Sequence, residues 1–146
     1  MGGPAVIARI VLGLALAAGA STAQAAVCSV QSAGVAFGAY DTLDPSPLDG
    51  IGSVHVDCDS DTSLTVDLGS GTGSFDQRRM SGGAASLDYN LYTEGTRSIV
   101  WGDGINGSDV SASGSSIDLP IYGRIPARQN VPVGTYSDTV IITVSY

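Results

Sequence analysis

The sequence predicts an all-β protein, an antiparallel β-sandwich of immunoglobulin-like type. Apolar and polar residues alternate with a period of two in most apolar segments, as they do in half-buried strands. Turn signals rich in Gly, Pro, Asp and Asn separate these segments, and no long stretch keeps the 3.6-residue period of a capped helix. Many short strands at this spacing favour a sandwich, with a closed barrel as the architectural alternative.

Composition narrows the function classes. The chain has 146 residues with 14 acidic side chains, and its 6 basic residues are all arginines, so the formal net charge is -8. This balance excludes nucleic-acid binding, which needs basic groups to neutralise phosphates. A hydrophobic content of 43% also excludes a disordered acidic tail.

The N-terminus resembles a secretory signal. Arg9 provides positive charge, Ile10–Ala18 forms a short apolar run, and Ala23-Gln24-Ala25 fits the small-x-small cleavage pattern. The apolar run is far shorter than the roughly 20 residues that cross a bilayer. We therefore predict a signal peptide over residues 1–25, a single domain over residues 26–146, and no transmembrane segment in the mature chain.

Export changes how the two cysteines are interpreted. In an oxidising compartment, Cys28 and Cys58 are expected to form a disulfide. The loop that they close contributes roughly 3–4 kcal/mol in the chain-entropy model. A metal site would need about four ligands, and His55 is the only histidine, so no metal is predicted.

Seven strands are expected between residues 29 and 146. The segment Gly102–Ser116 is polar and rich in small residues, and is interpreted as a long surface loop rather than a domain boundary, because each flank alone is too small to bury a core. The predicted strands are Ser29–Phe37, Ile51–Cys58, Ser63–Leu68, Ser86–Thr93, Ser98–Trp101, Ile117–Ile125 and Tyr136–Tyr146.

The last strand is the clearest. Val140, Ile142, Val144 and Tyr146 form one apolar face, and a largely Thr/Ser face alternates with it. Soluble proteins usually protect a free apolar strand edge from pairing, often with lysine, and this chain has no lysine. Two interpretations stay open: the strand is interior and fully paired, which the pattern alone favours, or its edge is left for a partner strand.

The sequence gives little support for catalysis. No G-x-S-x-G motif is present, and Glu94 is the only glutamate available for paired-carboxylate chemistry. His55 alternates with Val54 and Val56, which indicates a sheet-face histidine on the same side as Asp57. We predict no catalytic residue and no cofactor.

Two further motifs are assigned structural roles. The run Asp57–Asp61 resembles a calcium loop, but Thr62 and Leu68 replace the glycine and glutamate that such a loop needs. The pair Arg78-Arg79 is expected to form salt bridges with nearby aspartates or to lie on a polar rim.

An ordered set of short strings resembles the spore coat protein U domain family over residues 28–146. Each string is weak alone, and their order makes the set specific. They are Cys28 with Val35–Asp41, Leu48–Gly50, Val56–Cys58, Arg78–Met80, Leu87–Tyr92, Trp101–Gly104, Tyr122–Ala127 and Gly134–Thr139.

That family includes subunits of archaic, Csu-type chaperone–usher pili, and the resemblance implies a fold and a function. The fold would be an incomplete immunoglobulin-like sandwich whose final strand is supplied by a partner. A periplasmic chaperone, an outer-membrane usher and other pilus subunits would be the partners, through donor-strand complementation. Val140, Ile142, Val144 and Tyr146 would line the acceptor groove, and the product would be a structural or adhesive subunit of a surface fimbria.

Two alternatives to an ordinary fimbrial subunit stay open. Cleavage after Ala25 would leave only Ala26 and Val27 before Cys28, which favours a tip or terminating subunit that accepts a strand without donating one. A self-complete secreted domain that recognises carbohydrate or a coat component is the alternative from another function class.

Overall fold

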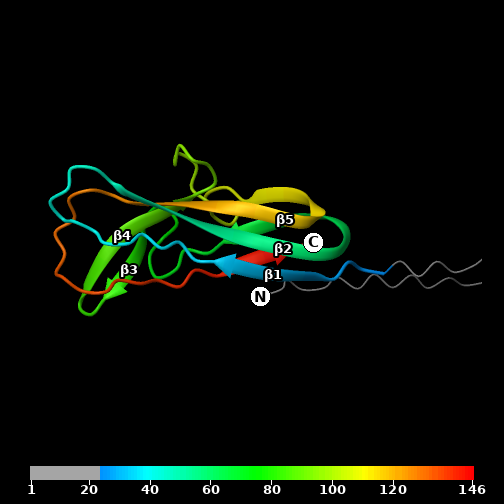
Figure 1. Cartoon of the computed structure of the whole chain (residues 1–146), viewed down its shortest axis with the longest axis horizontal. Coiled ribbons are helices and arrows are strands. Elements are labelled where there is room, and N and C mark those ends of the chain that lie inside the picture. The colour runs from blue at the N-terminus through cyan, green and yellow to red at the C-terminus, as the bar shows by residue number, and fades with distance from the viewer. Residues whose placement is uncertain (1–23) are drawn as a thin grey trace, which may run out of the picture.

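Two long strands, β2 (Leu48–Leu68) and β5 (Val110–Ile125), form the centre of the fold. The structure is a computed structural model that describes residues 24–146. β2 and β5 pair antiparallel along most of their length, with a register shift between Asp57 and Thr62. Figure 1 shows them running together along the long axis and curling back at one end. The curl allows both halves of one ribbon to contribute to a single core.

Four shorter strands complete the sheet. β1 (Cys28–Ala33) and β6 (Ile142–Ser145) both pair with β2, β4 (Ala85–Tyr92) pairs with β5, and β3 (Arg78–Gly82) pairs with β4, all antiparallel. β5 occupies one edge of β2 in both halves, so β1 and β6 both lie on the opposite edge. The prediction of an all-β antiparallel protein is confirmed, and the described part of the chain has no helix.

The core follows the two-residue alternation of the sequence. Val54 and Val56 in the first half of β2, and Val66 in the second half, are each 0% exposed. Burial of each such side chain contributes about 1.5–3 kcal/mol to folding. The other buried apolar residues are Leu64, Leu68, Met80, Leu87, Tyr89, Leu91, Trp101, Ile117, Ile121, Ile125 and Val144.

Arg78 is fully buried, and its hydrogen-bond acceptors are backbone carbonyls and a side-chain amide oxygen rather than a carboxylate. Its guanidinium donates to the carbonyl of Gly69 at 2.6 and 2.9 Å, to the carbonyl of Trp101 at 2.7 Å and to Oδ1 of Asn90 at 2.7 Å. Burial lowers the pKa of Arg78 from its usual value. The prediction of a salt bridge is therefore correct only for Arg79, which pairs with Asp88 at 3.1 Å. Arg78 instead ties three separate chain segments together.

Several predicted strand boundaries are wrong. Ile51–Cys58 and Ser63–Leu68 are one strand, because the turn residues between them bend the ribbon without ending it. Gly102–Ser116 is not a continuous loop: β5 begins at Val110, and its Ser-rich start pairs with the second half of β2. Pairing with β2 therefore makes the first residues of β5 a strand, although their Ser-rich composition is typical of a loop.

Three other differences concern a strand that the sequence did not predict, a predicted strand that forms only bridges, and the lengths of the first and last strands. β3 was not predicted, because its inward residue Arg78 is charged. Ser98–Trp101 forms only isolated bridges at Val100 and Trp101. Ser29–Phe37 and Tyr136–Tyr146 shorten to β1 and β6, because the residues beyond these strands have no neighbouring strand to pair with.

The predicted signal peptide, residues 1–25, falls almost wholly outside the described residues. Over residues 24–146, no helix long and apolar enough to cross a membrane is found.

Replacing Arg78 with Met should destabilise the protein strongly. The buried carbonyl of Trp101 and the partly buried carbonyl of Gly69 would lose their donors, and each unsatisfied buried group costs about 1–3 kcal/mol. We expect a loss of at least about 3 kcal/mol in the free energy of unfolding, measured by urea denaturation. Arg79→Met is the matched control, since an exposed ion pair contributes about 0–1 kcal/mol. Equal losses in the two variants would contradict this role of Arg78.

Candidate functional site

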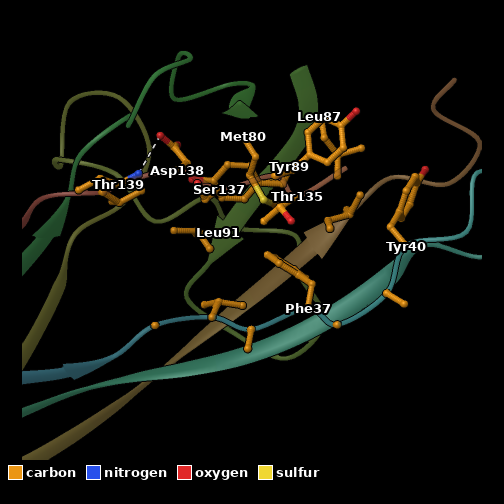
Figure 2. A pocket seen from close by; sticks show the side chains of 18 of the residues that line it. Phe37, Tyr40, Met80, Leu87, Tyr89, Leu91, Thr135, Ser137, Asp138 and Thr139 are labelled. Atoms are coloured by element: carbon orange, nitrogen blue, oxygen red, sulfur yellow. Dashed lines mark hydrogen bonds between the residues drawn. The ribbon is translucent and has the colours of Figure 1, made fainter. Parts of the chain in front are cut away.

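An apolar cleft of about 1020 Å³ lies between two irregular segments of the chain. One wall is residues 32–42, the end of β1 and the segment that follows it, and the other is residues 131–140, which precede β6. Figure 2 shows side chains from both walls pointing into the space between them. The floor is formed by Leu68, Met80, Leu87, Tyr89, Leu91, Ile121 and Ile125.

Phe37 anchors the first wall, because its ring packs against the backbone of two glycines, Gly50 and Gly123. We call these two residues the glycine seat. A Cβ atom built on Gly123 would lie 2.6 Å from Cζ of Phe37, and one on Gly50 would lie 3.0 Å from Cδ1 of the same ring. Only glycine leaves room for this ring on the inner face of β2 and β5. The Phe37 ring also meets Tyr89 edge to face, with the centroids 6.2 Å apart. Figure 2 shows Phe37 projecting from its wall toward Leu91.

The second wall is anchored at Ser137 and Asp138. Ser137 exchanges two backbone hydrogen bonds with Ser81 of β3, at 2.8 and 3.1 Å. The Asp138 carboxylate accepts hydrogen bonds from the Tyr89 hydroxyl at 2.6 Å and from the Thr72 hydroxyl at 2.7 Å. Burial and the hydrogen bond to Asp138 raise the pKa of Tyr89, so the phenol stays a donor. These contacts hold the wall against the β3–β4 hairpin.

Tyr40 links the first wall to the chain that leads into the second. Its hydroxyl donates to the carbonyl of Pro126 at 2.6 Å and accepts from the backbone N–H of Gln129 at 2.9 Å. The Gln129 side chain in turn bonds the backbone N–H and carbonyl of Asp88, each at 2.8 Å. One end of the cleft is therefore fixed by polar contacts, while the cleft floor is apolar.

No described strand covers the cleft. Residues 34–47 are irregular throughout, and residues 126–141 have only the bridge at Ser137. The two walls are therefore not joined to each other by a strand ladder. Open backbone edges beside an apolar floor are the features with which an extended peptide can pair.

The structure brings only part of the predicted groove residues to the cleft. Val140 and Ile142 line it, whereas Val144 is 0% exposed in the core and Tyr146 packs against the core, and neither of these two lines the cleft. β6 is paired with β2 along Thr65–Leu68, so the paired interpretation of the last strand holds on that side.

Sequence reasoning missed most of the floor and the first wall. The floor comes from β2, β3, β4 and β5, strands far from the C-terminus in sequence. The signal for the first wall was present in Val35–Asp41, a string that carried the family resemblance. Nothing in its pattern alone indicated that it faces a cleft.

The other predicted features lie outside the cleft. Cys28 and Cys58 form a disulfide across the β1–β2 pair. Asp59, in the calcium-like run, accepts a hydrogen bond from the backbone N–H of Val27 at 3.1 Å. Across residues 24–146, no group of three or more His, Cys, Asp or Glu side chains is placed to hold a metal ion. His55 does not line the cleft.

The chain is similar to known proteins in sequence and in fold. The Spore Coat Protein U domain family matches residues 15–143. Protein U of Myxococcus xanthus is 35% identical over 126 residues, which cover 75% of this chain and 70% of that protein. The fold resembles a chain of the CsuC–CsuE chaperone–tip adhesion subunit pre-assembly complex from archaic chaperone–usher Csu pili of Acinetobacter baumannii. The TM-score is 0.58 at 23% identity, over 83% of this chain and 40% of that chain. This likeness confirms the predicted fold class.

Replacing Gly123 with Ala should displace the Phe37 wall. The new methyl group would lie within 2.9 Å of both Phe37 and Val35 side chains, and overpacking of this kind costs about 1–3 kcal/mol. Gly95→Ala is the control, because its Cβ would meet Tyr122 at an ordinary 3.7 Å and should change stability by less than about 0.5 kcal/mol. Urea denaturation of the two variants measures the difference. If Gly123→Ala is as stable as Gly95→Ala, the glycine seat is not a constraint.

Proposed function

The chain belongs to the Spore Coat Protein U domain family, and we propose that it is a structural or adhesive subunit of a bacterial surface fimbria. In this proposal the subunit is assembled by the chaperone–usher route, and its cleft accepts an extended donor strand. It acts by strand exchange and not as an enzyme.

The uncovered cleft is the observation that supports the proposal most. Its floor is apolar, its volume is about 1020 Å³, and its walls are irregular over most of their length, whereas the neighbouring strands form a regular sheet. A donor strand that enters the cleft would pack one face on the apolar floor and pair its backbone with a wall. Strand addition of this kind takes its affinity from main-chain hydrogen bonds and its specificity from alternate side chains.

The cleft also sets the chemistry of the donor. The first wall spans residues 32–42, and an extended donor of about 10 residues at about 3.3 Å per residue would run its length. Every second donor residue would need an apolar side chain to contact floor residues such as Leu91 and Ile121. A charged residue at one of these positions would lose its hydration in an apolar site, which is costly.

The partners follow from strand donation. A periplasmic chaperone would supply the first strand, an outer-membrane usher would export the subunit, and another pilus subunit would supply the final strand. A tip or terminating position in the fibre is part of this proposal. The solved complex that this fold resembles contains a tip adhesion subunit, which is consistent with that position.

A self-complete secreted domain is the second candidate, and one observation favours it. β6 is already paired with β2, and Val144 is completely buried without any donor. In such a coat or carbohydrate-binding domain, the subunit alone would be stable and monomeric, and the cleft would not need a strand.

Replacing Val140 with Arg should impair chaperone binding. Val140 lines the cleft, and a charge there would oppose entry of an apolar strand. Co-expression with the cognate periplasmic chaperone, followed by co-purification, should show at least a tenfold loss of complex, about 1.4 kcal/mol.

Ile141→Arg is the matched control. Ile141 is 59% exposed and does not line the cleft, so this variant should co-purify like the unmodified subunit. Equal co-purification of both variants, or a stable chaperone-free monomer that binds no donor peptide, would reject donor-strand complementation and favour the second candidate.

A further inference from the structure

His55 lies on the outer face of the curled sheet, and both of its ring nitrogens contact carboxylates. Nδ1 is 2.5 Å from Oδ1 of Asp118, its directly opposed neighbour on β5. Nε2 is 2.9 Å from Oδ2 of Asp57, two residues along β2. The prediction that His55 and Asp57 share one face is confirmed by this contact.

Hydrogen-bond chemistry determines the protonation state that fits this geometry. A neutral imidazole has one N–H donor and one acceptor nitrogen, whereas an ionised carboxylate only accepts. One of the two contacts would then place two acceptors against each other. Only the imidazolium, which donates from both nitrogens, satisfies both carboxylates at once.

We propose that His55 is a proton-dependent clamp, which in its imidazolium form ties β2 to β5 through Asp57 and Asp118 and releases that tie when it loses its proton to solvent. The proposal is independent of the fimbrial function. It assigns to the fold a pH-sensitive device at a residue that does not line the cleft.

Among residues 24–146, Asp57 and Asp118 are the charged groups found in ion-pair contact with the ring. On β1, the residue opposite His55 is Gln31, which is uncharged. On β5 and β2 the charged groups that face the ring are Asp118 and Asp57 themselves. With the ring protonated, the cluster therefore carries a net charge of -1. With the ring neutral, it carries -2, and one carboxylate lies on each side of the ring. A single metal ion could not replace the proton, because the two nitrogens point away from each other.

The clamp acts where three strands meet. Ser53–Asp57 of β2 pairs with β1 on one edge and with β5 on the other, and the neighbouring inward residues Val54 and Val56 are fully buried. A cross-strand ion pair on the outer face therefore holds the same ladder that carries the core on its inner face.

The sign of the pH dependence follows from the contacts. The hydrogen bond to Asp118, and then that to Asp57, raise the pKa of His55 above its usual 6.5. The stabilisation is then fully present below about pH 6.5, the value of the unfolded chain, and is lost as the pH rises through the folded value.

His55 is the only histidine in the chain, so NMR can follow it without assignment ambiguity. In the ¹⁵N-labelled mature protein, with any histidine tag removed, the ring should titrate above pH 6.5. Asp118→Asn should lower the midpoint, and Asp57→Asn should lower it less. A midpoint at or below 6.5, or one that Asp118→Asn leaves unchanged, would overturn the clamp.

Urea denaturation between pH 5 and 9 tests the consequence for stability. The unfolding constant of the unmodified protein should rise about tenfold for each unit by which the pKa is raised. His55→Gln keeps a polar side chain and removes this proton site, so the increase over the same pH range should be absent. Equal pH profiles for the two proteins would also overturn the proposal.

Discussion

The fold depends on one constraint: the curled β2–β5 ribbon must bury a single core from both of its halves. Val54 and Val56 before the bend, and Val66 after it, are all completely buried in the same cluster. β1 and β6 attach to the free edge of this ribbon, and β4 extends the other side. Between residues 32–42 and 131–140, the chain beside this core is mostly irregular and forms the two walls of the cleft (Figure 1).

The polar contacts keep that opening in shape. Phe37 on its glycine seat fixes one wall, and the Asp138 contacts with Tyr89 and Thr72 fix the other. Arg78, through backbone carbonyls and Asn90, holds together the segments beneath the floor. The cleft is thus preorganised rather than collapsed. Preorganisation lowers the ordering cost of binding, which suits a site proposed to receive an extended strand.

Sequence patterns predicted the fold class because side-chain alternation reports which face of a strand is buried. The same patterns could not show where a partner strand is lacking. Tyr136–Tyr146 alternates along its whole length, yet only Ile142–Ser145 is a strand, since hydrogen-bonded pairing needs a neighbour that the earlier residues lack. Arg78 was expected to form a salt bridge or to lie on a polar rim, because its backbone acceptors are brought together only by the fold. Val140 and Ile142 were placed at the groove from the family resemblance, but the floor required the tertiary structure.

Hydrogen–deuterium exchange tests the central claim most directly, namely that the cleft accepts an extended strand. The subunit would be compared in its chaperone complex and after addition of a synthetic donor peptide of alternating apolar character. The account predicts that backbone amides of residues 32–42 and 131–140 are protected in both bound states, while those of the outer sheet face around His55 do not change. Protection that spares both walls, or no binding of any such peptide, would contradict it.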